Sequence, residues 1–161
     1  MAKAILICGK ICSGKSTFAR SLQEELGAVI LSCDEIENDI FHKSLGEAHD
    51  RVAADIEAYL QKKAVEITKA GVPVILDWGF WQRARRAAAE AYFRERGVET
   101  EWHYVEVTDE EWQRNICARN EAVTKGETDD YFVDEGLFQK IVSLFEPPAP
   151  GEMSVIRNPK Q

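Results

Sequence analysis

The chain of 161 residues has no long hydrophobic run, no paired-cysteine motif and no excess of positive charge. No apolar segment approaches the roughly 20 residues that a membrane-spanning helix requires, and the N-terminal residues lack the regions of a signal peptide. Twenty basic residues stand against 28 acidic ones, a formal net charge of -8 that disfavours binding to a nucleic-acid backbone. We therefore expect a soluble cytoplasmic protein, without membrane or nucleic-acid partners, whose oligomeric state the sequence leaves open.

Four cysteines are present, Cys8, Cys12, Cys33 and Cys117, and none is spaced with another cysteine or a histidine as a zinc site would be. This spacing predicts reduced thiols and no structural metal. Two interpretations of Cys12 stay open. A nearby lysine and a helix N-terminus should lower the pKa of its thiol, or the residue is simply a small side chain tolerated in a loop.

The most informative stretch is the loop Gly9-Lys10-Ile11-Cys12-Ser13-Gly14-Lys15-Ser16-Thr17, which follows an apolar run at 4–8 and precedes a helix-compatible segment. The pattern G-x-x-x-x-G-K-[ST] is typical of a loop whose backbone N–H groups converge on phosphate oxygens. Such a loop predicts nucleotide binding through the backbone of Gly9, Cys12, Ser13 and Gly14.

Three side chains of this loop have expected roles of their own. Lys15 supplies a positive charge to the β- and γ-phosphates, and the Ser16 hydroxyl is a ligand for Mg²⁺. Thr17 is expected nearer the α-phosphate. The implied cofactors are ATP and Mg²⁺.

Hydrophobic periodicity predicts alternating strands and helices along the rest of the chain. We expect one domain over 1–161 with an α/β, three-layer P-loop NTPase fold, in which a five-stranded parallel sheet has helices on both faces and a small arginine-bearing lid. The expected strands are 4–8, 29–32, 74–77, 102–107 and 153–157, and the expected helices are 15–26, 35–41, 46–70, 81–96, one after a capping box at 108–111, and 135–145.

Two acidic residues follow predicted strands, at the sheet edge where α/β proteins bind ligands. Asp34 lies just beyond the second strand, where it is a candidate general base or, alternatively, an N-cap for the helix beginning at Glu35. Asp77 ends the third strand in the manner of a Walker B acid, which predicts support of the Mg²⁺ shell or a hydrogen bond to the loop backbone.

Arginines cluster on two predicted helices. Arg114 and Arg119 lie on the helix after the fourth strand, where they are either phosphate or adenine contacts or a solvated helix face. Arg83, Arg85 and Arg86 follow the third strand, where they either bind an anionic acceptor or pair with Glu90 and its neighbours on the surface.

Taken together, the loop, Asp34, the run Asp77-Trp78-Gly79-Phe80 and the run from Arg114 to Asn120 resemble small P-loop kinases of the zeta-toxin, chloramphenicol-phosphotransferase and polynucleotide-kinase group. The resemblance implies ATP-dependent phosphoryl transfer to a hydroxyl of a small-molecule acceptor. It implies Asp34 as the base, Arg119 on a lid spanning about 114–134, and a contact of Arg114 with the cofactor. The chain departs from the group at Asn115, where relatives commonly carry arginine.

Two other functions remain open. One is a nucleoside, nucleotide or polynucleotide 5′-hydroxyl kinase, of which the acidic composition disfavours the last. The other, from a different class, is a regulatory module that binds ATP with slow or no hydrolysis. The phosphate loop recognises the charge and geometry of phosphate groups, so its sequence does not identify the acceptor.

Overall fold

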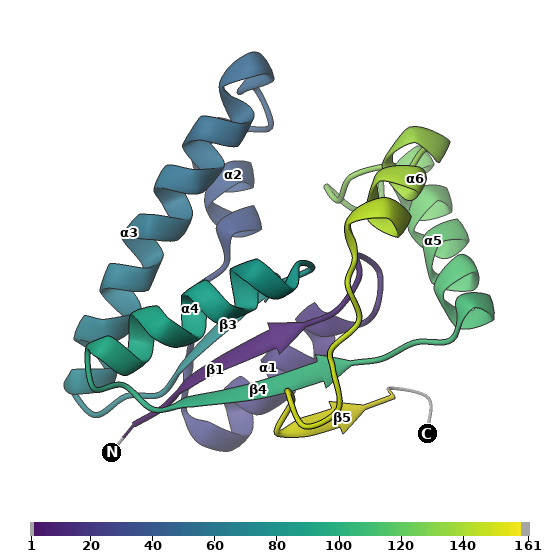
Figure 1. The fold of residues 1–161 in the computed structure, drawn as a ribbon. Helices are drawn as coiled ribbons and strands as arrows, with labels where there is room; N and C mark the ends of the chain where they lie inside the picture. The colour runs from purple at the N-terminus through teal and green to yellow at the C-terminus, as the bar shows by residue number, and fades with distance from the viewer. Residues whose placement is uncertain (1, 159–161) are drawn as a thin grey trace.

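The computed structural model describes residues 2–158, and its centre is a parallel five-stranded sheet (Figure 1). The strands lie in the order β2-β3-β1-β4-β5. Their bounds are β1 Ala4–Cys8, β2 Val29–Ile30, β3 Val74–Gly79, β4 Thr100–Val105 and β5 Val155–Arg157. The expected α/β fold with a five-stranded parallel sheet is confirmed.

Six α-helices and one short 3₁₀ helix connect these strands within the described residues. Their bounds are α1 Lys15–Leu26, α2 Cys33–Phe41, η1 Gly46–Ala48, α3 His49–Lys69, α4 Arg83–Glu95, α5 Asp109–Thr124 and α6 Glu135–Leu144. The predicted start and end of α1 are correct, with Gly27 closing it in the left-handed conformation. The predicted capping box of α5 at Thr108 and Glu111 also forms.

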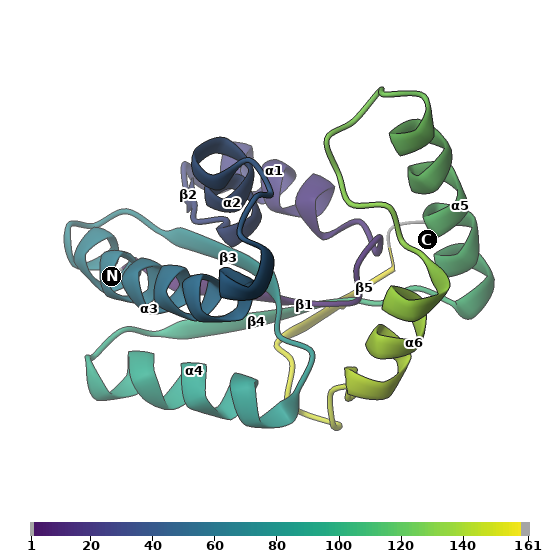
Figure 2. The same cartoon turned by 90° about the horizontal axis from the view of Figure 1, so that it is seen from above.

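Alternate residues of β1 pack against helices on opposite faces of the sheet. Ala4 and Leu6 belong to a buried cluster that includes residues of α3 and α4, whereas Ile5 and Ile7 pack with α1. Figure 2 shows α1 and α4 on opposite sides of the strands. Because both faces are covered, β1 is apolar throughout and completely buried.

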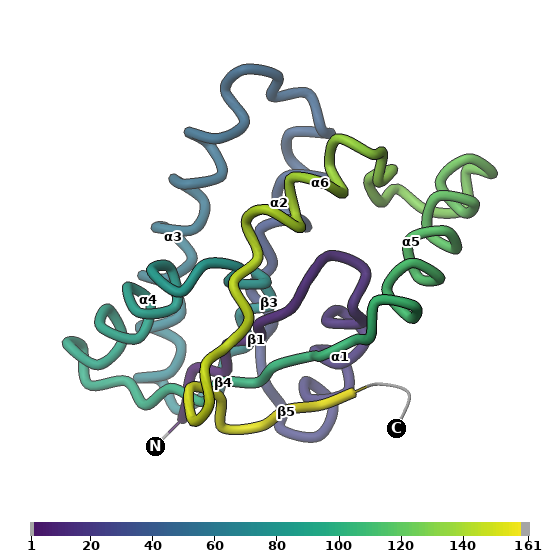
Figure 3. The backbone as a smooth tube through the Cα atoms, turned by 45° about the vertical axis from the view of Figure 1, so that its right-hand side comes forward, coloured from purple at the N-terminus to yellow at the C-terminus, as the bar shows by residue number. Residues whose placement is uncertain are grey.

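The carboxyl ends of the strands carry the loops of functional interest. In Figure 1, α2 and α3 rise at one side of this edge, and α5 and α6 rise at the other. Figure 3 follows the chain from α5 through α6 and back down to β5. The loop after β1 therefore lies between two helical walls.

Several boundaries differ from those expected. Strand β2 has two residues rather than four, because Ser32 caps α2 by accepting a hydrogen bond from the Glu35 backbone N–H. The alternative role of Asp34 as the cap is therefore wrong, since α2 begins at Cys33. Strand β3 continues to Gly79, whose carbonyl accepts a hydrogen bond from the Gly9 N–H.

The remaining elements match the expected ones with shifted ends: α3 and α4 are shorter than predicted, and β4 both begins and ends two residues earlier. Among residues 2–158, no helix combines the length and apolar character needed to cross a membrane.

Candidate functional site

The loop from Gly9 to Gly14 has the tight geometry that phosphate binding requires. A Cβ on Gly9 would lie 2.8 Å from Ser13 Oγ and 3.0 Å from the Val105 carbonyl, so no larger residue fits there. Gly14 adopts φ 94°, in the region that favours glycine. Cys12 has φ 60°, an uncommon value for a residue with a side chain.

The loop also holds a polar group without a partner. Ser13 Oγ is buried and has no hydrogen-bond partner in the described part of the chain. A buried hydroxyl left unpaired is costly, and a bound phosphate oxygen would satisfy it. The N-terminus of α1 begins immediately afterwards at Lys15, which adds the positive end of a helix dipole. The residues present therefore fit a nucleotide phosphate.

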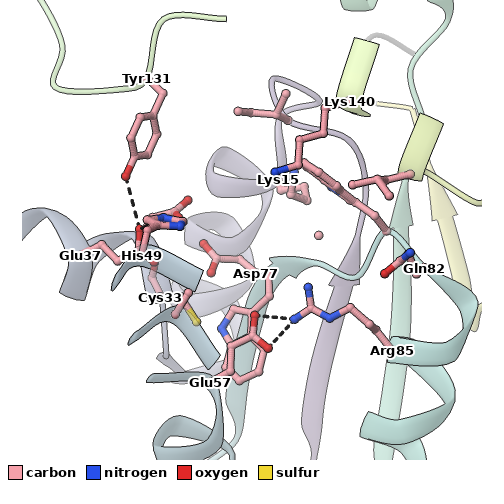
Figure 4. Close-up of a pocket in the computed structure, with 18 of the residues that line it drawn as sticks. Lys15, Cys33, Glu37, His49, Glu57, Asp77, Gln82, Arg85, Tyr131 and Lys140 are labelled. Carbon is pink, nitrogen blue, oxygen red and sulfur yellow. Dashed lines mark hydrogen bonds and ion pairs between the residues drawn. The ribbon is translucent and has the colours of Figure 1, made fainter. Parts of the chain in front are cut away.

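Lys15 lies where the loop meets the two acidic residues predicted from the sequence. Its Nζ donates a hydrogen bond to the Lys10 carbonyl. Burial lowers the pKa of Lys15 to about 8, while the charges of Asp77 and Asp34 oppose this shift. Lys15, Asp34 and Asp77 line one cavity, which Figure 4 shows in close-up.

Asp77 is the more buried of the two carboxylates. Burial, followed by the charge of exposed Asp34, raises the pKa of Asp77 to about 6, and Lys15 opposes the shift. Ser16 is exposed in the first turn of α1, next to Lys15. Hydroxyl and carboxylate oxygens are hard ligands of the kind that Mg²⁺ prefers, so Ser16 and Asp77 fit a magnesium-bound nucleotide.

The cavity at Lys15 has a volume of about 480 Å³ and extends away from the loop between α2, α3, α4 and α6. Its walls include the aromatic side chains of Trp78, Trp81 and Tyr131. We call this space the acceptor-side cavity. Its size suits a small organic molecule.

Two sets of polar side chains that contact one another line the acceptor-side cavity (Figure 4). Glu37, only 5% exposed, accepts hydrogen bonds from Tyr131 at 3.3 Å and lies 3.2 Å from His49 Nε2. Arg85 pairs with both carboxylate oxygens of Glu57. Helices α2, α3 and α4 and the segment before α6 thus all contribute polar side chains.

A second cavity, of about 860 Å³, lies on the other side of the loop. It is lined by loop residues including Cys12, Ser13 and Gly14, by Thr17 and Phe18 of α1, by Arg119 of α5, and by the end of β5. Arg157 stacks over the Phe18 ring at 4.7 Å. We call this space the nucleotide-side cavity.

The arginines predicted as site residues have different surroundings. Arg119 is half-buried, lines the nucleotide-side cavity and lies 3.7 Å from Asp130. Arg114 is exposed on α5.

Arg86 is 2% exposed and bonded to Glu152 and two main-chain carbonyls, so it is not available to an acceptor. The alternative interpretation, a surface pairing with Glu90, is also wrong for Arg86, because Glu90 accepts hydrogen bonds from Thr100 and Trp102.

The expectation of a lowered pKa for Cys12 is wrong. Burial raises the pKa of this thiol, and the positive charges of Arg119 and Lys15 offset the shift only in part. Cys12 packs with Trp112 and Ile116 in a small apolar cluster. It behaves as a small buried side chain, which was the alternative interpretation.

Several polar residues that line the acceptor-side cavity were not predicted from the sequence as site residues. Glu37 had a detectable signal, since it lies three residues after Asp34 and hence on the same face of a helix. His49, Glu57 and Tyr131 come from separate elements, and no local pattern brings them together.

Solved structures with the same fold include several kinases. APS kinase of Mycobacterium tuberculosis, solved with AMPPNP and APS, has a TM-score of 0.70 and 17% identity, covering 99% of this chain and 90% of that one. A gluconokinase from Sinorhizobium meliloti has a TM-score of 0.70 and 15% identity, covering 99% and 83%. A sugar kinase from Janibacter sp. has a TM-score of 0.68 and 15% identity, covering 100% and 87%.

These similarities show a P-loop kinase-like fold. No curated protein sequence matches the chain. The sequence profile of one family, described as the AAA domain, matches residues 5–148, which include the phosphate loop, Asp34, Asp77 and Arg119. The chain therefore belongs to the AAA domain family.

Proposed function

We propose that the protein is an ATP-dependent phosphotransferase that moves the γ-phosphoryl group of Mg-ATP to a hydroxyl of a small-molecule acceptor. One observation supports the proposal most strongly: loop residues line two cavities, the nucleotide-side cavity and the acceptor-side cavity. Lys15, Asp34 and Asp77 line the acceptor-side cavity. A protein that only binds nucleotide needs the nucleotide-side cavity alone. The acceptor-side cavity provides room for an acceptor next to the terminal phosphate.

The residues of the loop have simple roles in this proposal. Backbone N–H groups from Gly9 to Gly14 and the charge of Lys15 hold the phosphates. Ser16 and Asp77 would hold the Mg²⁺, which would supply neutralisation of the phosphate charge. Thr17 lies in the nucleotide-side cavity, consistent with an α-phosphate contact.

Asp34 is the proposed general base. An alcohol is a weak nucleophile, and a carboxylate within reach accepts its proton as the new O–P bond forms. Asp34 fits because it is exposed to the acceptor-side cavity and is not used as a helix cap. Arg119 is the proposed contact for charge on the transferring phosphoryl group, and Arg114 the proposed further cofactor contact, both on a lid of about 114–134.

The acceptor side supports a small polar molecule. Aromatic walls offer stacking surface, and the paired charges of Glu37 with His49 and of Glu57 with Arg85 offer hydrogen bonds without a large net charge. This composition is consistent with the narrower resemblance to the zeta-toxin, chloramphenicol-phosphotransferase and polynucleotide-kinase group. Within it, we favour a small molecule over an oligonucleotide.

The test is Mg-ATP-dependent ADP release by purified protein across alcohols, aminoglycosides, sugars, nucleosides and oligonucleotides. Lys15→Ala is the blank, and Lys63→Ala, a surface lysine on α3, is the matched control. We expect release that rises with one acceptor class and disappears in Lys15→Ala only. Tight ATP binding with no acceptor dependence would favour a regulatory module, and stimulation by oligonucleotides alone would favour a polynucleotide kinase.

A further inference from the structure

Four successive carbonyls of the phosphate loop, from Gly9 to Cys12, each accept a hydrogen bond from a side chain. The donors are Trp81 Nε1 to Gly9 at 3.1 Å, Lys15 Nζ to Lys10, Trp112 Nε1 to Ile11 at 2.7 Å, and Asn115 Nδ2 to Cys12 at 2.9 Å. Each of these hydrogen bonds fixes the orientation of one peptide unit of the loop. Because a peptide's N–H points opposite to its carbonyl, the four donors also fix the directions of the N–H groups in those peptide units.

Two of the four donors come from α5, more than 100 residues away in sequence. Trp112 is 2% exposed and packs in the same cluster as Cys12. Asn115 lies one turn further along the helix, and its amide holds the carbonyl of Cys12, the residue with φ 60°. An uncommon backbone conformation persists when surrounding contacts determine it. The Asn115 amide is such a contact.

The same face of α5 carries Arg119. Asn115, Ala118 and Arg119 have the i, i+3, i+4 spacing of one helix face, and all three line the nucleotide-side cavity together with the loop. The charge of Arg119 acts to lower the pKa values of both Cys12 and Lys15. The Asn115 hydrogen bond thus joins the loop to the helix segment that presents Arg119.

We propose that Asn115 is a positioning residue for phosphoryl transfer: its amide fixes α5 against the phosphate loop and thereby sets where Arg119 meets the terminal phosphate. The inference rests on the proposed function, since Arg119 has this task only if a nucleoside triphosphate is bound. It goes further by assigning a role to a neutral residue whose amide donates to the Cys12 carbonyl.

The test is a double-mutant cycle on the affinity for Mg-AMPPNP, measured by titration calorimetry. Asn115→Ala should weaken binding about fivefold, the effect of one lost hydrogen bond. In the Arg119→Ala background, the same substitution should change affinity less than about twofold, because the residue that it positions is gone. Gln113→Ala, an exposed neighbour on α5, is the matched control and should bind like the wild type.

A merely structural role predicts a different outcome. Equal losses from Asn115→Ala in both backgrounds, or no loss in either, would overturn the proposal. Asn115→Leu, which keeps the volume of the side chain without its amide, repeats the cycle if the alanine variant does not fold. Failure of the wild type to bind Mg-AMPPNP would instead refute the proposed function, so the two failures are distinguishable.

Discussion

Replacing Arg86 should lower the free energy of unfolding strongly. Arg83 and Arg85 lie close to it in sequence, but Arg86 alone of the three is buried. Its guanidinium donates to the Phe80 carbonyl at 2.9 Å and the Trp81 carbonyl at 3.2 Å, and it pairs with Glu152. Arg86→Ala leaves a partly buried carboxylate and two carbonyls without these donors. Removing one partner of a buried ion pair costs about 3–5 kcal/mol, which corresponds to a drop of about 10 °C in Tm for a chain of this size.

Urea unfolding at pH 7 measures this free energy, with Arg94→Ala as the control because Arg94 is exposed on the same helix. The control should lie within about 0.5 kcal/mol of the wild type. Burial acts against ionisation of Glu152, but its hydrogen bonds from Arg86 lower the pKa of this carboxyl overall. Its contribution is therefore complete above the unfolded pKa and lost as pH falls through the folded one.

The difference between wild type and Arg86→Ala should consequently shrink at acidic pH. An unfolding free energy for Arg86→Ala within about 1 kcal/mol of the wild type at pH 7 would refute the assignment of Arg86 as a structural residue.

Three further predictions concern the loop and the lid. Iodoacetamide at pH 7.5 should label exposed Cys117 much faster than Cys12, whose thiol is buried and has a raised pKa; equal labelling rates would contradict this. Gly9→Ala should weaken Mg-AMPPNP binding more than tenfold, because the new Cβ would crowd Ser13 and the Val105 carbonyl. Gly136→Ala in α6 is the control and should bind Mg-AMPPNP like the wild type, because a Cβ has room there. Mg-ATP should protect the segment 124–134 from limited proteolysis, and cleavage at an unchanged rate would count against closure of a lid.

The elements that the sequence predicted well carry local signals. The phosphate loop, the Gly27 stop of α1 and the capping box of α5 each depend on residues close together in sequence, and each is found in the structure. The end of β3 was missed because the charged residue Asp77 ends the apolar run of the predicted strand. The strand continues beyond it because Gly79 pairs with Cys8 of β1 and accepts a hydrogen bond from the Gly9 N–H.

The surroundings of side chains were harder to predict. Arg86 was grouped with Arg83 and Arg85, yet it shares a helix face with buried Ala89 and Phe93, and this i, i+3, i+7 spacing was the available signal. For Cys12, the nearby charges were correctly identified, but burial outweighs them. The pairing of His49 with Glu37 depends on the packing of α2 against α3, which no local pattern encodes.

The most direct test of phosphoryl transfer is mass spectrometry of the acceptor after incubation with Mg-ATP, comparing the wild type with Asp34→Asn. We expect the wild type to form ADP and a phosphomonoester of the acceptor in equal amounts. Asp34→Asn should still bind Mg-ATP but form at least about 100-fold less product per unit time, because it lacks the base. Inorganic phosphate with an unmodified acceptor would contradict phosphoryl transfer, and undiminished transfer by Asp34→Asn would contradict the assignment of the base.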